Sequence, residues 1–246
     1  MEKTVEKVVQ WLQQEAEQAR AKGLLVGVSG GLDSAVVAYL IKRAFPQHSL
    51  GVIMPLKSNP ADVHHAQKVV DGCNINHLTI DLTKTHDSLY SHIQSKVEHM
   101  GNNTLKDNRL ADANLRARLR MSTLYTIAAH YNYLVVGTDN ASEWYTGYFT
   151  KYGDGGVDIL PIVSFTKGEV REMAEFLGVP NDVIYKEPSA DLWDGQTDEE
   201  EMGTSYDKID AYLKGEQIPA KDQEIIEQMH QRTEHKRLPI KRFDIK

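Results

Sequence analysis

The chain has 246 residues, 41% hydrophobic and 26% charged, so it can bury a sizeable apolar core and has neither a disordered nor a fibrous composition. Its 28 basic and 35 acidic residues give a net charge of −7, which argues against a broad nucleic-acid or anionic-membrane surface but leaves room for a local basic pocket. Cys73 is the single cysteine, so one chain cannot build a disulfide framework or a cysteine-based zinc cluster, and a reducing cytoplasm fits best.

The first twenty residues predict an amphipathic helix. Val5, Val8, Val9 and Leu12 have i, i+3, i+4, i+7 spacing, and the segment lacks the apolar core of a signal peptide. No apolar run approaches the roughly 20 residues needed to cross a bilayer. We therefore expect a soluble, cytoplasmic protein with no membrane partner.

Short apolar segments alternate with helical patterns along the chain. The segments are 24–28, 50–54, 76–80 and 133–137, and 157–163 is a possible fifth. Such alternation is typical of a parallel sheet. We predict an α/β fold in which a Rossmann-like parallel sheet of about five strands carries helices on both faces, with residues 1–246 forming a single domain.

Several helices carry clear boundary signals. Residues 34–44 are apolar nearly all round, 60–72 open with Asn59 as cap and Pro60 at the first position, and Thr166 with Glu169 forms a capping box for 166–177. Further helices are expected near 204–213 and 221–233. The candidate irregular regions are 101–110, 146–157 and 186–203, and the acidic run from Asp198 to Glu201 is either a solvated segment or part of a lid.

A glycine-rich turn, "VGVSGGLDSAVV", links the first strand to the helix after it. It lacks the lysine of the P-loop and the third glycine of the dinucleotide fingerprint. Backbone N–H groups at the helix N-terminus still make an anion site, which the glycines let a phosphate approach closely. Asp33 would repel a polyphosphate unless a divalent cation lies between them, which indicates Mg²⁺. The alternative is that Asp33 or Ser34 only caps the helix.

The residues "SGGLDS" resemble the pyrophosphate-binding loop of the ATP pyrophosphatases, which split ATP into AMP and pyrophosphate to adenylate a carboxylate or carbonyl oxygen. The resemblance implies that this loop holds ATP, and the residues it assigns to ATP here are Gly27, Val28, Ser29, Gly30, Gly31, Leu32, Asp33 and Ser34. The motif does not identify the second substrate.

The segment from "NLRARLRMSTLY" through "GTDNASEWYTGYFTKYGDGGVDILP" to "FLGVP", with "TEHKR" near the end, resembles the ammonia-dependent NAD⁺ synthetases. These enzymes convert deamido-NAD⁺, ATP and ammonia into NAD⁺, AMP and pyrophosphate through an acyl-adenylate. The resemblance implies a parallel sheet between helices and a homodimer.

The same resemblance assigns roles to individual residues. It places Thr138, Lys167 and Ser189 on ATP, with Ser189 standing where the family typically has threonine. It makes Glu143 a second carboxylate for Mg²⁺ opposite Asp33, and it counts Asp33, Glu143, Asp158 and Lys167 as catalytic. The residues implied to contact deamido-NAD⁺ are Arg118, Lys151, Asp158, His235 and Lys236.

Physical arguments bear on some of these roles. An apolar stripe on one helix puts Asn114 and Arg118 on one flank and Arg116 with Arg120 on the other, so the arginines do not form one patch. Each arginine could instead be solvated or paired with acids. Asp139 and Asn140 could be no more than a helix cap, so neither is counted as catalytic.

Two other functions remain open at this level. An RNA-modifying ATP pyrophosphatase is disfavoured by the acidic charge and the single cysteine. A non-catalytic nucleotide sensor is disfavoured by the combination of Asp33, Glu143 and Lys167. The expected donor is free ammonia, because the chain has no room for a glutaminase, and the expected partners are small molecules rather than nucleic acid.

Overall fold

The computed structural model describes residues 1–100, 108–188 and 197–243. Its strands are β1 (Gly23–Gly27), β2 (Ser49–Ile53), β3 (Asn76–Thr79) and β4 (Tyr133–Val135). Its helices are α1 (Glu2–Gln18), α2 (Leu32–Ala44), α3 (Pro60–Gly72), α4 (Thr83–His99), α5 (Arg109–Tyr131), α6 (Ala141–Thr146), α7 (Lys167–Leu177), α8 (Asn181–Ile184), α9 (Asp198–Met202), α10 (Tyr206–Leu213) and α11 (Ala220–Arg237).

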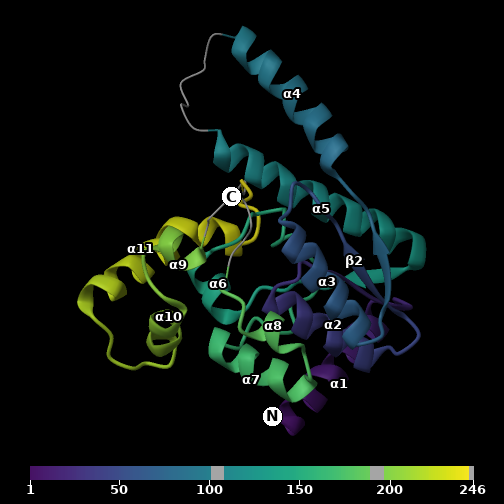
Figure 1. Ribbon diagram of the computed structural model, residues 1–246. Coiled ribbons are helices and arrows are strands. Elements are labelled where there is room, and N and C mark those ends of the chain that lie inside the picture. The colour runs from purple at the N-terminus through teal and green to yellow at the C-terminus, as the bar shows by residue number, and fades with distance from the viewer. Residues whose placement is uncertain (101–107, 189–196, 244–246) are drawn as a thin grey trace.

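The strands form a parallel sheet in the order β3-β2-β1-β4, and β2 is labelled in Figure 1. Leu24 of β1 lies opposite Ser49 of β2 on one side and Leu134 of β4 on the other. The chain therefore runs outward from β1 to β3 and then returns to β4 on the opposite side of β1. In open parallel sheets this reversal of strand order leaves a crevice at the carboxyl ends, where ligands bind.

The predicted fifth strand is a single bridge in the described chain. Val136 pairs with Ile159 in parallel, and residues 161–164 form a turn. Pro161 has no N–H to donate to a ladder, which explains why the apolar run does not extend the sheet.

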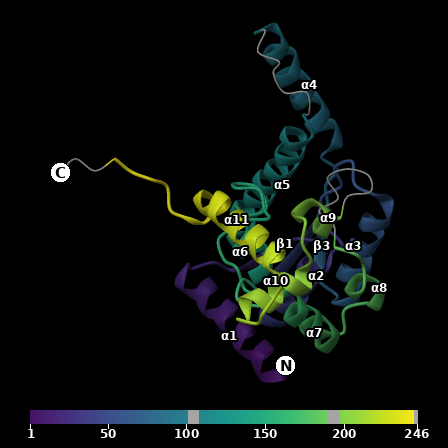
Figure 2. The same cartoon turned by 90° about the vertical axis from the view of Figure 1, so that its left-hand side faces the viewer.

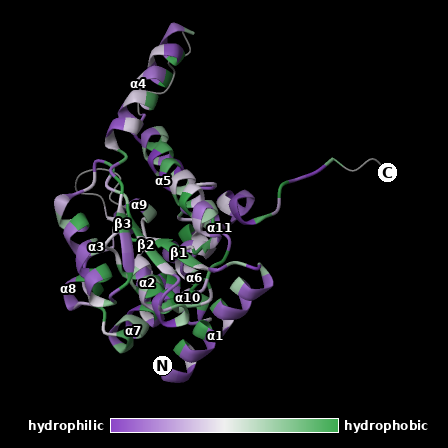
Figure 3. Cartoon of the chain, turned by 90° about the vertical axis from the view of Figure 1, so that its right-hand side faces the viewer, coloured by the Kyte–Doolittle hydropathy of each residue, from purple (hydrophilic) through white to green (hydrophobic). Residues whose placement is uncertain are grey.

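Helices cover both faces of the sheet, as predicted. Leu24 and Val26 of β1 belong to a core shared with α1, α2, α3 and α7, whereas Leu25 belongs to a second core shared with β2, β4 and α5. Successive side chains of a strand point to opposite faces, so β1 supplies both cores. Figure 3 shows both hydrophilic and hydrophobic bands along the helices that surround the sheet.

Two further parts lie outside this sandwich. Helix α4 extends beyond the sheet together with the N-terminal part of α5 (Figure 2). Helices α9, α10 and α11 share a smaller apolar cluster, centred on the buried Met202, Tyr206, Ile209 and Ile226. Within the described ranges, no helix combines the length and apolarity that crossing a membrane requires.

Candidate active site

The glycine turn after β1 is packed directly against α3. Gly30 has φ +86°, and a Cβ at this position would lie 2.3 Å from Asp62 O and 2.9 Å from Ala66 N. Only glycine satisfies both the left-handed backbone and this close approach. Gly31 is different, because a Cβ there would meet only Ser29 Oγ, at 3.4 Å.

Two serine hydroxyls hold the turn together, and that of Ser29 accepts from Gly31 N at 3.2 Å. Ser29 N donates to Ser34 Oγ at 3.2 Å, and Ser34 Oγ donates to Gly31 O at 3.0 Å. Helix α2 begins at Leu32 with Gly31 as its N-cap and has no side-chain cap bond. The capping alternative for Asp33 and Ser34 is therefore wrong: Ser34 closes the turn, and the Asp33 carboxylate points elsewhere.

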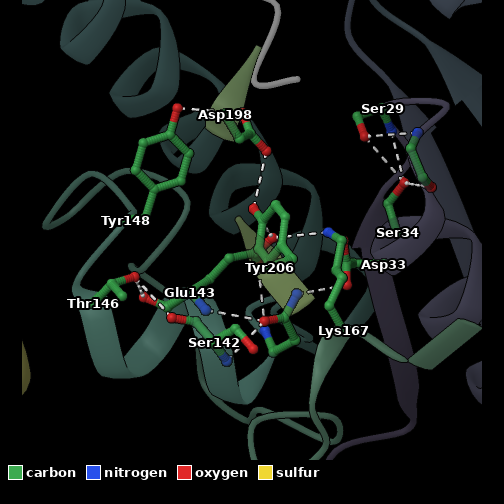
Figure 4. A network of polar contacts seen from close by, with 12 residues as sticks. Ser29, Asp33, Ser34, Ser142, Glu143, Thr146, Tyr148, Lys167, Asp198 and Tyr206 are labelled. Carbon is green, nitrogen blue, oxygen red and sulfur yellow. Dashed lines mark hydrogen bonds and ion pairs between the residues drawn. The ribbon is translucent and has the colours of Figure 1, made fainter. Parts of the chain in front are cut away.

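Asp33 contacts a residue that follows β4 and the first residue of α7. Its Oδ1 accepts from Asn140 Nδ2 at 2.9 Å, and its Oδ2 lies 2.5 Å from Lys167 Nζ. Glu143 Oε1 lies 3.1 Å from the same ammonium nitrogen (Figure 4). The fold thus brings Asp33, Glu143 and Lys167 together from three different helices.

The charged side chains of this cluster are largely buried, so their charges interact strongly with one another. The side chains of Lys167, Asp33 and Glu143 are 6%, 15% and 14% exposed. Burial and the Asp33 charge raise the pKa of Glu143 to about 7, against the opposing effect of Lys167. Burial alone would lower the pKa of Lys167, but the two carboxylates outweigh it and raise that pKa. The ammonium therefore stays charged between the carboxylates.

The donor set at this position suits a magnesium ion that also binds a substrate. Asp33 and Glu143 direct carboxylate oxygens at one cation position, which Lys167 fills here. Across the described ranges, no three His, Cys, Asp or Glu side chains come together in a way that could hold a metal. Mg²⁺ is commonly held by one or two carboxylates, with phosphate oxygens and water completing its shell.

Asn140 does two things at once. Its Oδ1 accepts from the backbone of Ser142 and Glu143, and Glu143 Oε2 accepts from Asn140 N, which makes a capping box at the start of α6. Its Nδ2 donates to Asp33. Sequence reasoning identified only the cap, because the N-x-x-E spacing is fully explained by it and nothing in it points to Asp33.

Lys167 is fixed in place by the start of its own helix. The predicted capping box of Thr166 and Glu169 is present. Asp210 of α10 accepts from Lys167 N at 3.2 Å, Gly168 N at 2.8 Å and Ser142 Oγ at 2.6 Å. A buried carboxylate on these N–H groups offsets the unfavourable position of a lysine at a helix N-terminus.

The acidic segment at 198–201 is not simply solvated. It forms α9, and Asp198 is 5% exposed. Asp198 Oδ2 accepts from Tyr206 Oη at 3.0 Å, and Tyr206 Oη also lies 3.3 Å from Glu143 Oε1. The solvated interpretation is wrong for Asp198, because two tyrosines surround this carboxylate, the second being Tyr148.

Basic residues implied to bind the dinucleotide gather around the turn at 147–156. Lys236 donates to Gly147 O at 2.7 Å and Phe149 O at 2.5 Å. Lys151 Nζ donates to His235 O, and Arg118 donates to Lys151 O at 3.3 Å. The His235 side chain is exposed, so the structure links this residue to the cluster through its backbone oxygen.

The two predicted flanks of α5 are confirmed. Asn114 accepts from Thr150 Oγ1 at 2.8 Å, so it faces the same turn as Arg118. On the other flank, Arg116 pairs with Asp112, and Arg120 donates to Met54 O at 3.3 Å. The paired alternative thus describes Arg116, whereas Arg118 is exposed beside the turn.

Asp158 lies apart from the carboxylate pair. It accepts from Val135 N at 2.8 Å and from Tyr125 Oη at 3.0 Å, so it ties the segment after the turn to β4 and α5. Thr138 is half-buried just beyond β4. Ser189, implied to contact ATP, lies outside the described residues.

Asp139 is a buried carboxyl group that sequence reasoning set aside. It is 4% exposed, and its Oδ2 has no hydrogen-bond partner within the described part of the chain. Burial, followed by the charges of Asp154, Glu143 and Asp33, raises the pKa of Asp139 well above its ordinary value.

Comparison with known proteins gives a consistent result. Residues 4–239 match the family model described as NAD synthase. The NH3-dependent NAD⁺ synthetase of Alkaliphilus oremlandii is 57% identical over 241 residues, which cover 96% of this chain and 95% of that protein.

Two solved structures resemble the whole chain. The NMN synthetase of Francisella tularensis superposes with a TM-score of 0.92 and 39% identity, covering 99% of this chain and 98% of that one. The NH3-dependent NAD synthetase of Campylobacter jejuni superposes with a TM-score of 0.78 and 28% identity, covering 99% of both chains.

Proposed function

The chain belongs to the NAD synthase family, and on that premise we propose that it is a ligase that amidates deamido-NAD⁺ with ammonia at the expense of ATP. The products are NAD⁺, AMP and pyrophosphate, and the reaction is the last step of NAD⁺ formation. The observation that carries this proposal is the convergence of Asp33 and Glu143 on one cation position beside the glycine turn.

The reaction proceeds in two steps. The nicotinate carboxylate attacks the α-phosphorus of ATP, the bond to the β-phosphate oxygen breaks, and pyrophosphate leaves an acyl-adenylate behind. Ammonia then attacks the carbonyl carbon, AMP departs, and a proton is lost to give the amide. A free carboxylate resists attack by an amine because it is anionic and lacks a good leaving group, and adenylation removes both obstacles.

The glycine turn and Lys167 act on the phosphates. The backbone of residues 29–34 opens onto the N-terminus of α2, where the helix dipole favours negative charge. Asp33 and Glu143 would hold Mg²⁺, which when bound neutralises charge on the phosphate oxygens. Lys167, which pairs with both carboxylates in this structure, is assigned to a phosphate oxygen of bound ATP.

The basic residues around the 147–156 turn form the side of the site proposed for deamido-NAD⁺. Arg118 and Lys151 are linked to each other and to the end of α11 by hydrogen bonds. Lys236 holds the start of this segment to α11, and Asp158 holds the chain after it to β4. We assign Arg118 and Lys151 to direct contact with the substrate, His235 to the edge of the same surface, and Lys236 and Asp158 to shaping the turn.

A second candidate is amidation of the mononucleotide. The greater similarity to a protein named NMN synthetase, with a TM-score of 0.92 against 0.78, favours it. The chemistry at the nicotinate carboxylate is the same, and the two substrates differ in whether an AMP unit is attached to the ribose phosphate.

One assay tests both candidates. The purified protein is given ATP, Mg²⁺ and ammonium with either deamido-NAD⁺ or nicotinic acid mononucleotide, and the amide product and pyrophosphate are quantified. We expect the higher kcat/KM with deamido-NAD⁺. A higher value with the mononucleotide would replace the first candidate by the second, and no amide from either substrate would refute both. Glutamine in place of ammonium should give no comparable turnover.

The exposed face of α4 supports the homodimer implied by family membership. Leu89, Ile93 and Val97 follow one another at four-residue spacing and are 40%, 42% and 46% exposed, and Met100 is 75% exposed. Such a stripe is costly to leave in water and suits a second copy of the chain.

The remaining expectations complete the proposal. Residues 1–246 act as one domain, which the family match over 4–239 supports. A cytoplasmic location would supply ATP and keep Cys73 reduced.

A further inference from the structure

The hydroxyl of Tyr206 lies between two carboxylates that come from different elements. Its oxygen is 3.3 Å from Glu143 Oε1 of α6 and 3.0 Å from Asp198 Oδ2 of α9 (Figure 4). Tyr206 is 3% exposed and Asp198 is 5% exposed, so water does not compete freely for these contacts. The contact therefore connects a carboxylate of the candidate cation site to a helix outside it.

We propose that Tyr206 is a positioning residue that orients the Glu143 carboxylate for a divalent cation, and that Asp198 competes with Glu143 for the single proton of the Tyr206 hydroxyl. This inference rests on the proposed function, because it assumes that Asp33 and Glu143 hold the cation with ATP.

The contacts around Glu143 explain why it depends on the tyrosine. Glu143 Oε1 accepts from Lys167 Nζ and Tyr206 Oη, and Glu143 Oε2 accepts from Asn140 N at 3.3 Å. A divalent cation at this position competes with the ammonium group for the same oxygen. The hydroxyl and the backbone N–H are then the contacts that keep the carboxylate pointed at the cation.

The ring of Tyr206 has a role that is separate from its hydroxyl. Lys167 Nζ lies 4.7 Å from the ring centroid, a cation–π distance. Burial and the Glu143 and Asp198 charges raise the pKa of Tyr206, so the hydroxyl remains a donor. Phenylalanine keeps the ring and removes only the donor, which makes Tyr206→Phe the informative substitution.

The test measures the binding of a non-hydrolysable ATP analogue by calorimetry, once with Mn²⁺ and once with EDTA. The ratio of the Kd in EDTA to the Kd with Mn²⁺ is the gain from Mn²⁺. We expect Tyr206→Phe to reduce the gain from Mn²⁺ by about tenfold or more. Binding in EDTA should not change. Asp198→Asn removes the charge that competes with Glu143 for the hydroxyl proton, so the gain should stay at the wild-type value or exceed it. In turnover assays, saturating Mn²⁺ should restore most of the kcat of Tyr206→Phe.

The matched control is Tyr212→Phe. This hydroxyl is on the same helix and contacts Glu227 and Tyr145 instead of Glu143, so the gain from Mn²⁺ should stay at the wild-type value. A full wild-type gain in Tyr206→Phe would overturn the inference, as would an equal loss of analogue binding with and without Mn²⁺. If Tyr206→Phe does not fold, Asp198→Asn decides alone, and a gain below the wild-type value in this variant would overturn the inference.

The proposed function has its own readout in this experiment. Asp33→Asn should abolish the gain from Mn²⁺ altogether. If Mn²⁺ does not tighten analogue binding to the wild-type protein, or if Asp33→Asn keeps the gain, the cation site itself is refuted. If Asp33→Asn abolishes the gain from Mn²⁺ and Tyr206→Phe leaves it unchanged, only the positioning role is refuted.

Discussion

Lys167 Nζ lies 2.5 Å from Asp33 Oδ2, and this ion pair joins the first residue of α7 to the first turn of α2 beyond the carboxyl end of β1. Both groups are largely buried. In the free protein a side chain therefore neutralises the carboxylates that the proposed function assigns to a metal ion. Binding of metal and nucleotide then requires the ammonium group to change partners.

Removal of this ammonium should separate its two effects. We expect Lys167→Met to slow pyrophosphate release by about 10²–10³-fold, because a charge on the phosphates is lost. The same variant should bind Mn²⁺ without nucleotide roughly tenfold more tightly, since about 1.4 kcal/mol of competing ion pairing is absent. Electron paramagnetic resonance of free Mn²⁺ measures the second effect. Lys208→Met, which removes a lysine paired with Asp222, is the control and should do neither.

The two glycines of the turn should respond differently to alanine. Gly30→Ala places a methyl group against the Asp62 and Ala66 backbone at a positive φ, and we expect a loss of roughly 1–3 kcal/mol or more in the free energy of unfolding. Gly31→Ala meets only a serine hydroxyl and should unfold like the wild type while its KM for ATP rises. Urea denaturation and ATP kinetics of both variants decide the matter; equal stability of the two would contradict the packing argument.

Asn140 offers a way to separate helix capping from contact with Asp33. Asn140→Ser keeps a capping oxygen but has no amide to donate to Asp33, whereas Asn140→Ala loses both contacts. We expect the alanine variant to be less stable than the serine variant by about 1 kcal/mol. Both should show weaker Mn²⁺-dependent pyrophosphate release to a similar extent. If pyrophosphate release falls only in the less stable alanine variant, the activity depends on the helix cap and not on the contact with Asp33.

The raised pKa of Asp139 predicts a stability change that depends on pH. A carboxyl group whose pKa is raised on folding stabilises the folded state fully below its unfolded pKa, and this contribution is lost as the pH rises through the folded pKa. Asp139→Asn removes this titration. The melting temperature of the variant relative to the wild type should therefore rise between pH 5.5 and pH 8.5. A difference that is constant over this range, in thermal scans at several pH values, would show that Asp139 is ionised in the folded protein.

The apolar stripe of α4 can be tested through assembly. The double variant Leu89→Lys with Ile93→Lys should sediment as a monomer, because two ammonium groups cannot be buried against a second copy without a large desolvation cost. Ser91→Lys, on another face of the same helix, should leave sedimentation unchanged. A wild-type protein that is monomeric at micromolar concentration would refute the dimer directly.

Local signals in the sequence were sufficient for most of the fold. The apolar segments at 24–28, 50–54, 76–80 and 133–137 became strands within one or two residues of their predicted ends, and the caps at Asn59 and Thr166 are present. These features depend on nearest neighbours along the chain. The failure at 157–163 has the same origin, because hydrophobicity predicted a strand that Pro161 interrupts.

A residue of the site could be predicted only where a local motif or the family resemblance marked it. Asp33 stood out because a carboxylate beside a phosphate loop needs an explanation, and Glu143 and Lys167 came from family resemblance. Tyr206 carried no signal, and Asp198 stood out only as the start of an acidic run, because their contacts with the site depend on α9 and α10 folding back onto α6. Asn140 was hidden by its second role, since a helix cap already accounted for the residue.

The separate apolar cluster of α9, α10 and α11 implies that the site can come apart without the sheet unfolding. Tyr206, Asp210 and Asp198 all belong to these helices, and each contacts the start of α6 or α7 or a residue that does so. Opening of this small unit would free the Lys167 backbone and the Glu143 carboxylate together while leaving β1 and α2 intact. Amide exchange at 198–213 should therefore be faster than in the sheet, and a bound nucleotide should slow it from a distance.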